Sequence, residues 1–567
     1  MFSNIRRYFN KKIKRSYSSI DPDEIFLDSQ NLPDFNTDQF EGRIEKVISP
    51  YVFRAVTFFL MAVVIVFMAR IWHLQVADGA TLRAKSESNR LHNTAIFADR
   101  GVIYDRHGIQ LAWNTISQAT TSDFSLRMYA TSTGLSHTLG YIKYPTKDSS
   151  GFYYQNKFDP KDGVEKVYNT ALSGKDGMKI VETDVRGNVT SESVVQPPQD
   201  GANLTLSIDA RVQKRLYESM IDLAGRAGFR GGAAVIMDIA TGEIIANANF
   251  PEYDSQTMTD GKDATKITGW LQNKENAFLN RTVNGLYTPG SIVKPFIAMG
   301  VLDQKVIDPR KQILSTGSIS IPNPYDPKKS SIFNDWKAHG YVDLRKALAV
   351  SSNVYFYEVG GGYKDQKGIG IANIEKYVRM FGLGTTTGIV FPGEKKGVIP
   401  NPEWKKQTFD GEIWRVGDTY NTAIGQYGFQ VTPLQVVRAT AALANEGTLL
   451  VPTFLKGQAP KVSGRINLSP TYYTIVKEGM RQGVTEGTSM ALSVPFVEIA
   501  SKTGTAQIGL NKDQVNSWVI GFWPYKNPRY AYAVVMEKAS KANQFGAVLV
   551  MKGLFDWMGI YATEYLK

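Results

Sequence analysis

A serine and a lysine stand three residues apart in the stretch 287–296, "YTPGSIVKPF". This spacing places the side chains of Ser291 and Lys294 on one face of a helix. The Thr-Pro-Gly turn before Ser291 predicts the start of that helix, where free backbone N–H groups can stabilise an oxyanion. Taken alone, the pattern favours a helix N-cap at Ser291 over a nucleophile beside its base.

The rest of the sequence offers few other bases for a serine nucleophile. Residues 202–567 contain one histidine, His339, and a Ser-His-Asp triad requires a histidine within hydrogen-bond reach of the serine. The chain has no cysteine, which excludes disulfides, thiolate zinc sites and a cysteine nucleophile. Lysine remains, but its ordinary pKa of about 10.4 must be lowered by burial and a neighbouring cation. A lysine-activated serine therefore predicts a second lysine nearby.

Two further stretches supply the groups that such a site needs. In "AVSSNVYFYE" (349–358), Ser351 and Asn353 lie where one helical pattern ends and another begins, so a loop can present a hydroxyl and an amide together. In "SKTGTAQ" (501–507), Lys502 supplies the second lysine. We expect this stretch to form a strand beside a hairpin over 517–537.

The residues after Lys502 also fit a substrate-binding strand. Thr503, together with Lys502, can hold an anionic group, and Gly504 lets a substrate backbone approach. S-x-x-K, S-x-N and K-T-G follow in one order, with 60 residues from Ser291 to Ser351 and 151 from Ser351 to Lys502. Each motif alone indicates no more than a cap or a turn, whereas the three together favour a catalytic site.

The three motifs resemble those of class B penicillin-binding proteins, which are membrane-anchored peptidoglycan D,D-transpeptidases. The stretch 98–112, "ADRGVIYDRHGIQLA", is similar to the R-G-x-I-x-D-R-x-G segment that opens the family's non-catalytic pedestal, and 163–177 also resembles the pedestal. Arg100, Gly101, Asp105 and Arg106 in that segment are expected to be structural, with contact to a partner protein as the alternative.

The resemblance implies a serine acyl-enzyme mechanism without a cofactor. Lys294 would take the proton of Ser291, Ser351 would relay a proton, and Asn353 would orient Lys294. Lys502, Thr503 and Thr505 would bind the terminal carboxylate, and the N–H groups of Ser291 and Thr505 would hold the oxyanion. The implied catalytic residues are Ser291, Lys294, Ser351, Asn353 and Lys502, and the implied substrate-binding residues are Thr503, Gly504 and Thr505.

Within the class, three stretches resemble the elongation type, penicillin-binding protein 2: residues 333–360, 397–404 and 414–435. The division type is the nearest rival. The resemblance implies stem peptides as substrates, β-lactams as ligands, and a RodA-like SEDS glycosyltransferase as a partner. No glycosyltransferase-like segment precedes the pedestal, which favours class B over class A, and no PASTA-like repeat follows the last predicted helix.

Other functions share parts of this pattern. A β-lactamase or a low-mass carboxypeptidase would use the same serine and lysine chemistry, but the anchor and the long pedestal argue against both. A β-lactam sensor usually has several spans and a cytoplasmic signalling domain, and neither is visible. A non-catalytic scaffold that activates a polymerase is disfavoured by the intact motif residues.

One apolar segment predicts a membrane anchor. Residues 55–69, "AVTFFLMAVVIVFMA", carry no charge, and the extended segment 51–76 is long enough to cross about 30 Å of hydrocarbon. Arg54 and Arg70 lie near its ends, where long side chains reach the interface. A buried core helix and a cleaved signal peptide are both disfavoured by its length and position.

The flanking charges predict the orientation of this anchor. By the positive-inside rule, the basic N-terminal segment places that end in the cytoplasm and everything after about residue 77 outside. The basic residues before the first acidic one are Arg6, Arg7, Lys11, Lys12, Lys14 and Arg15. The formal charge of +12 does not indicate nucleic-acid binding, because no zinc-finger spacing and no RNA-binding aromatic signature accompany it.

The fold class follows from the order of the expected elements: a multidomain α/β (α+β) protein. Residues 1–50 predict a cytoplasmic tail that is mostly disordered, 51–76 a transmembrane helix, 77–205 an elongated β-rich pedestal, and 206–567 the catalytic domain. The resemblance implies the D,D-peptidase and β-lactamase fold for that domain, with a central antiparallel sheet flanked by helices.

Particular elements of the catalytic domain can be placed from local patterns. Asp209 is a plausible N-cap for a helix over the following residues. Residues 233–250 and 517–537 predict two hairpins, and 546–566 a closing amphipathic helix. Strands from both ends of the domain, with helices between, predict one central sheet.

Overall fold

The structure is a computed structural model that describes residues 49–116, 123–131, 134–148, 153–183, 189–323, 326–509 and 511–567. The predicted tail lies almost wholly in residues 1–48, outside the described residues. The chain divides into two compact units, Met1–Arg90 and Leu91–Lys567.

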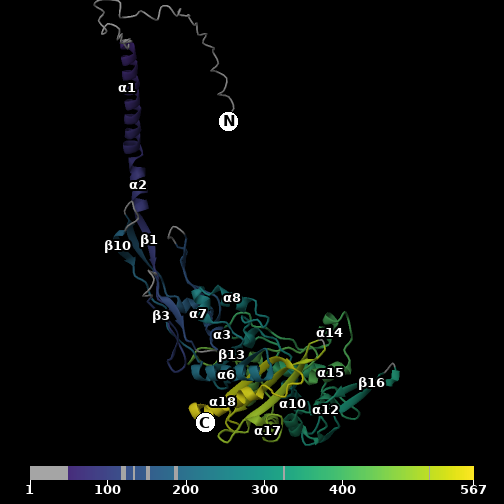
Figure 1. Cartoon of the computed structure of the whole chain (residues 1–567). Helices are drawn as coiled ribbons and strands as arrows, with labels where there is room; N and C mark the ends of the chain where they lie inside the picture. The colour runs from purple at the N-terminus through teal and green to yellow at the C-terminus, as the bar shows by residue number, and fades with distance from the viewer. Residues whose placement is uncertain are drawn as a thin grey trace, which may run out of the picture. The chain divides into compact units, whose positions relative to one another are not determined.

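The described part of the first unit is helical (Figure 1). It consists of α1 (Pro50–Trp72), a π-helical segment η4 (His73–Ala77) and α2 (Gly79–Arg90). Among the described residues, Pro50–Ala77 is the one helical stretch long and apolar enough to cross a membrane, with a mean hydropathy of 2.5 and no buried residue in its most apolar window. The helix predicted over 51–76 is confirmed, and it is consistent with a single-pass anchor.

The second unit contains a five-stranded antiparallel sheet in the order β13-β12-β22-β21-β20. Both predicted hairpins are confirmed, and the K-T-G strand pairs beside the second of them. The two ends of the catalytic domain therefore build one sheet. Its strands are β12 (Gly231–Asp238), β13 (Ile244–Phe250), β20 (Ala500–Ile508), β21 (Gln514–Trp523) and β22 (Tyr530–Ser540).

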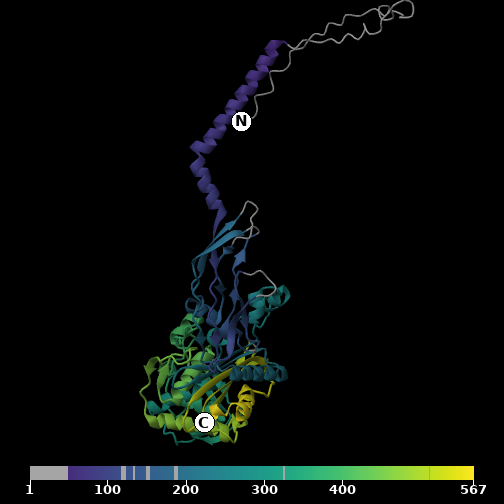
Figure 2. The same ribbon diagram turned by 90° about the vertical axis from the view of Figure 1, so that its left-hand side faces the viewer.

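Helices cover both faces of this sheet, so its strands are buried on both sides. Alternate residues of a strand point to opposite faces, so Trp518 and Ile520 of β21 join one core and Val519 and Trp523 the other. Helices α6 (Ala210–Ala227) and α18 (Val548–Tyr561) pack on the second of these cores, side by side in both views (Figures 1 and 2). Helix α16 (Pro433–Ala444) packs on the first.

The predicted cap of α6 is confirmed, because the Asp209 carboxylate accepts hydrogen bonds from the N–H groups of Arg211 and Val212. Besides α16, the described helices between the two sheet-forming ends are α7 (Ser255–Asp260), α8 (Ala264–Leu271), α9 (Arg281–Asn284), η5 (Gly290–Val293), α10 (Lys294–Asp303), α11 (Leu344–Val350), α12 (Asn353–Gly361), α13 (Ile371–Met380), α14 (Pro402–Thr408), α15 (Val416–Ala423), α17 (Pro470–Thr485) and η6 (Met490–Leu492). The helix η7 (Thr563–Leu566) follows α18. The additional strands are β14 (Ile313–Ser315), β15 (Ser318–Asn323), β16 (Asp326–Asn334), β17 (Gly340–Val342), β18 (Thr448–Leu450) and β19 (Val462–Arg465).

The segment from residue 91 to 205 is built mainly of short strands, as predicted for the pedestal. Its two larger sheets have the orders β1-β9-β10 and β11-β2-β3-β4. Its strands are β1 (Leu91–Ile96), β2 (Ile103–Tyr104), β3 (Gln110–Thr115), β4 (Leu126–Tyr129), β5 (Ile142–Lys143), β6 (Thr146–Lys147), β7 (Tyr153–Gln155), β8 (Asp159–Pro160), β9 (Gly177–Thr183), β10 (Val189–Gln196) and β11 (Leu204–Thr205), and its helices are α3 (Ser136–Leu139), α4 (Gly163–Val167) and α5 (Asn169–Leu172).

A buried ion cluster holds the centre of the pedestal. Arg100 Nη2 lies 2.6 Å and Arg127 Nε 2.7 Å from the Glu165 carboxylate, and all three side chains are at most 1% exposed. Arg100 also donates to Asn169. A buried carboxylate is stable when cations and hydrogen bonds surround it in this way. Arg100 is thus structural, as the sequence predicts.

The next residues of the same segment join the pedestal to the catalytic domain. The Asp105 carboxylate accepts from the N–H groups of His107 and Ile109 and from the N–H of Ala210 in α6. Arg106 Nη2 lies 3.6 Å from the carboxylate of Glu243. A side chain at Gly101 would collide with the Ala202 carbonyl at 2.0 Å, so only glycine fits there. These residues have internal structural contacts.

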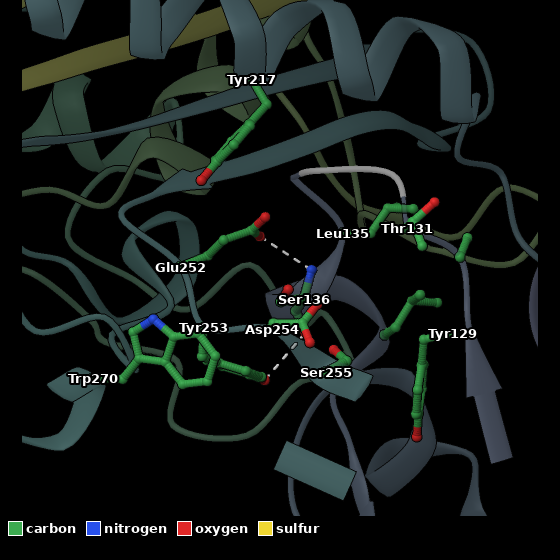
Figure 3. Close-up of a pocket in the computed structure, with 12 residues that line it drawn as sticks. Tyr129, Thr131, Leu135, Ser136, Tyr217, Glu252, Tyr253, Asp254, Ser255 and Trp270 are labelled. Carbon is green, nitrogen blue, oxygen red and sulfur yellow. Dashed lines mark hydrogen bonds between the residues drawn. The ribbon is translucent and has the colours of Figure 1, made fainter. Parts of the chain in front are cut away.

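A cavity of about 210 Å³ lies where the pedestal meets the catalytic domain, lined in part by Tyr217, Tyr253 and Trp270 (Figure 3). The Glu252 carboxylate accepts from the N–H of Gly134 at 2.5 Å and from that of Ser136 at 3.1 Å. Burial nevertheless raises the pKa of Glu252 to about 7. An ionisable group thus bridges the two parts of this unit.

We expect Glu252→Gln to flatten the dependence of stability on pH. Between 4.5, its ordinary pKa, and about 7, the folded chain binds more protons than the unfolded chain, so the free energy of unfolding falls as pH rises. The variant should lack a loss of up to about 3 kcal/mol across this window. Urea unfolding of both proteins on the acid and alkaline sides measures it. A difference that stays constant with pH contradicts the expectation.

Candidate active site

Ser291 lies in a short 3-10 turn, η5, and Lys294 is the first residue of α10. The sequence predicts both residues within one helix, and the structure places the boundary between 3-10 and α geometry at Lys294. Side chains at i and i+3 of a 3-10 turn are eclipsed, so the pair still shares one face. Within the described residues, no hydrogen bond joins Ser291 Oγ to Lys294 Nζ.

Glycines allow three chain segments to meet around this turn. Gly290 has a φ of +59°, and a Cβ at this position would lie 2.9 Å from the Thr505 carbonyl oxygen. Gly425 has a φ of +74°, and its Cβ would lie 2.2 Å from the Gly290 carbonyl oxygen. A Cβ on Gly504 would meet Ile292 and the Pro289 carbonyl, both at 2.9 Å. The lack of a side chain at Gly504 therefore lets the turn of Ser291 pack against β20. The sequence predicts a different reason for this glycine, the approach of a substrate backbone.

The Lys294 ammonium faces the turn that contains the second motif. Its Nζ donates to the Ser351 carbonyl oxygen at 2.9 Å, the Ser352 carbonyl oxygen at 3.2 Å and Asn353 Oδ1 at 2.8 Å. Lys294 is fully buried. Its Nζ also lies 5.3 Å from the centre of the Phe356 ring, which provides a cation–π contact.

Ser351 connects the two lysines. It has a φ of +60° at the C-terminal end of α11, a left-handed conformation that is rare outside glycine and asparagine. Its carbonyl oxygen accepts from Lys294, and its Oγ accepts from Lys502 Nζ at 2.7 Å. Lys502 also donates to the Thr503 carbonyl oxygen at 2.8 Å. One serine therefore contacts both lysine amines.

Burial controls the protonation of both amines. Burial lowers the pKa of Lys294 to about 7, against the Asp335 charge that raises it. Burial also lowers the pKa of Lys502 well below its ordinary value, and the Lys294 charge lowers it further. The sequence predicts that the cation of Lys502 lowers the pKa of Lys294, whereas in the structure the larger cause at Lys294 is burial. The two amines repel each other when both are protonated, so the charge of one disfavours protonation of the other.

A cleft of about 1150 Å³ gathers the remaining predicted residues. Ser291 is partly exposed in it, and Thr505 is exposed on the edge strand β20. Thr503 Oγ1 donates to Thr488 Oγ1 at 2.6 Å. Predicted residues that line the cleft are Ser291, Ser351, Asn353, Thr503, Gly504 and Thr505, while Lys294 and Lys502 lie in its wall through the contacts above.

Several lining residues were missed by the sequence analysis. These include Asp335 and Thr488. Asp335 lies inside the stretch 333–360, whose resemblance to penicillin-binding protein 2 is visible in the sequence, so that resemblance could have marked it. Thr488 carries no such signal, because only the fold brings it to Thr503.

Comparison with known proteins agrees with this fold. The family model "Penicillin binding protein transpeptidase domain" matches residues 232–551, and the "Penicillin-binding Protein dimerisation domain" matches residues 119–206. The chain belongs to the penicillin-binding protein transpeptidase family, in its elongation-type branch, penicillin-binding protein 2. The family resemblance seen in the sequence is confirmed, as are the elongation type and the D,D-peptidase fold class.

The individual relatives are peptidoglycan D,D-transpeptidases. The chain is 32% identical to the peptidoglycan D,D-transpeptidase MrdA of Acinetobacter baumannii over 74% of this chain and 64% of that protein's length. It is 26% identical to MrdA of Escherichia coli over 88% and 93%. The structure of PBP2 of Pseudomonas aeruginosa in complex with WCK 5153 is 28% identical and covers 84% of this chain and 98% of that one, with a TM-score of 0.69.

Proposed function

We propose that this chain cross-links peptidoglycan stem peptides through an acyl-enzyme on Ser291. One observation carries the proposal: Lys294 and Lys502 both contact Ser351, and Asn353 completes the shell around Lys294, in the wall of the cleft that Ser291 lines. These side chains come from three segments that are far apart in the sequence, and each belongs to a different motif.

The first half of the proposed reaction is acylation. Lys294 in its neutral form takes the proton of the Ser291 hydroxyl, and Ser291 Oγ attacks the carbonyl of the penultimate D-Ala. The backbone N–H groups of Ser291 and Thr505 hold the resulting oxyanion. Collapse of this intermediate breaks the peptide bond. Ser351, which contacts both lysines, relays a proton to the leaving D-Ala amine.

The second half transfers the acyl group. Lys502, Thr503 and Thr505 bind the terminal carboxylate of the donor during the first half, and release of D-Ala vacates that position. The amine of a neighbouring stem peptide then attacks the ester carbonyl, returns Ser291 as a free hydroxyl and forms the cross-link. A β-lactam would acylate the same serine, because its strained amide occupies the place of the scissile bond.

The proposed setting is the outer face of the cytoplasmic membrane. The apolar helix Pro50–Ala77 supports a single span, and the basic residues before it favour an N-terminus inside and a catalytic domain outside. The structure of PBP2 from Helicobacter pylori in complex with MreC is 26% identical, with a TM-score of 0.67, and it supports an MreC-like partner. A RodA-like SEDS glycosyltransferase is a further proposed partner, which rests on the family resemblance of the sequence. The proposed domains are 1–50 (tail), 51–76 (span), 77–205 (pedestal) and 206–567 (catalytic).

Labelling with a fluorescent penicillin tests the serine mechanism. The full chain in detergent is expected to form a stable fluorescent adduct, and Ser291→Ala is expected to form none. Ser219→Ala, which changes a buried serine of α6 away from the cleft lining, is the matched control and should label like wild type. Absence of labelling in wild type, or equal labelling of Ser291→Ala, contradicts the proposal.

A further inference from the structure

A buried carboxylate outside the three motifs organises the turn that faces Lys294. Asp335 follows β16, and its side chain is 0% exposed. Its Oδ2 accepts from Ser352 Oγ at 2.9 Å, the Asn353 N–H at 2.7 Å and the Val354 N–H at 3.0 Å. Ser315 Oγ adds a further contact at 3.3 Å. One carboxylate oxygen thus holds three consecutive residues of the second motif.

The same turn supplies the oxygens around the Lys294 ammonium. The acceptors for Lys294 Nζ are the carbonyl oxygens of Ser351 and Ser352 and the side-chain oxygen of Asn353. Asp335 fixes Asn353 through its N–H and Ser352 through its hydroxyl, so displacement of the carboxylate would move two of these three acceptors. Asp335 therefore acts on Lys294 through the turn and not by direct contact.

The charge of Asp335 has a second effect on the same lysine. It favours the protonated form of Lys294 and opposes the effect of burial. The other titratable groups near Lys294 are Lys502 and His339. Asp335 also acts on Tyr357, because its charge raises the pKa of that side chain. Burial lowers the pKa of His339 below its ordinary value and raises that of Tyr357 to a value above the range of the experiment below. Tyr357 therefore does not contribute to a titration near neutrality. His339, whose imidazole lies 3.7 Å from Asp335, titrates on the acidic side of Lys294.

We propose that Asp335 is a positioning residue for acylation: it holds the turn of residues 351–354 so that its oxygens face Lys294. This inference rests on the proposed serine mechanism and adds to it a residue that lies outside the three motifs. The competing explanation is a helix cap at the start of α12 that stabilises the fold without affecting the reaction.

The rate of acylation by a fluorescent penicillin, measured from about pH 5 to about pH 9, separates these explanations. In Asp335→Asn, we expect the rate on the alkaline plateau to fall roughly 10-fold to 100-fold, because the turn shifts relative to Lys294. We also expect the acidic limb to move to lower pH, because the charge that raised the pKa of Lys294 is gone. Asp335→Glu keeps the charge, so its acylation rate should rise over the same pH range as that of wild type.

Asp209→Asn is the matched control, because Asp209 is also a buried carboxylate that caps a helix of the same domain. This variant should lose stability and keep the pH profile of wild type. An Asp335→Asn protein that loses stability but keeps the wild-type plateau and limb overturns the inference, whereas wild type that is not acylated at all overturns the proposed function.

A further variant covers the case in which Asp335→Asn does not fold. Ser352→Ala removes one donor to Asp335 and leaves every charge in place. It is expected to lower the plateau rate and to keep the limb unmoved. A wild-type plateau in Ser352→Ala would then count against the positioning role.

Discussion

The Lys294→Met variant is expected to be acylated by a penicillin roughly 10² to 10⁴ times more slowly than wild type. Methionine keeps the length and apolar stem of the side chain but removes the amine that takes the proton of Ser291. The loss should be large because, among the described residues, Lys294 is the basic side chain closest to Ser291 in sequence and shares its face of the turn. The measurement is the time course of labelling at saturating fluorescent penicillin.

The pH dependence of wild type provides an independent check of the same role. A general base acts in its neutral form, so the acylation rate should rise with pH through about 7, the pKa to which burial lowers Lys294. Lys405→Met is the matched control: Lys405 is also buried, lies 2.8 Å from Asp418, and does not line the cleft. It should keep the rising limb. Wild-type labelling rates in Lys294→Met would refute the assignment of the base.

The second large effect is expected at the centre of the pedestal. Glu165→Gln should lower the free energy of unfolding of this region by about 3–5 kcal/mol, because it leaves the charges of Arg100 and Arg127 buried without their partner. Burial by itself raises the pKa of Glu165. Arg127 and Arg100 lower it by more, so the pKa of Glu165 lies below its ordinary value. The stabilisation is therefore present above the unfolded pKa and is lost as pH falls through the folded pKa.

Glu192→Gln is the control for this prediction. Glu192 pairs with Lys179 at 2.9 Å across two strands of the same pedestal, with 48% and 29% of these side chains exposed, and such solvent-accessible pairs contribute about 0–1 kcal/mol. Hydrogen exchange of the amides in β3 and α4, compared with that of the central sheet, reports the stability of the pedestal by itself. Equal exchange in the two variants would show that the buried cluster contributes no more than the exposed pair.

Elements with a strong local pattern were predictable. The cap at Asp209, the two hairpins and the apolar helix follow from side-chain periodicity and turn residues, which act over a few positions along the chain. The fold class followed from the order of these elements. The strand β11 follows from the local pattern of 202–208, but its pairing with β2 could not be predicted, because this partner lies about a hundred residues earlier.

The sequence by itself determined the reactive groups: a serine with a lysine on the same face, and a second lysine to accompany it. The tertiary structure alone decided their contacts, because Lys502 reaches Ser351 across 151 residues and Asp335 reaches the turn of Ser352 and Asn353 from another segment. It also decided the protonation of Lys294 and Lys502. The pKa of a lysine depends on its burial and on nearby charges, and neighbours along the chain show neither.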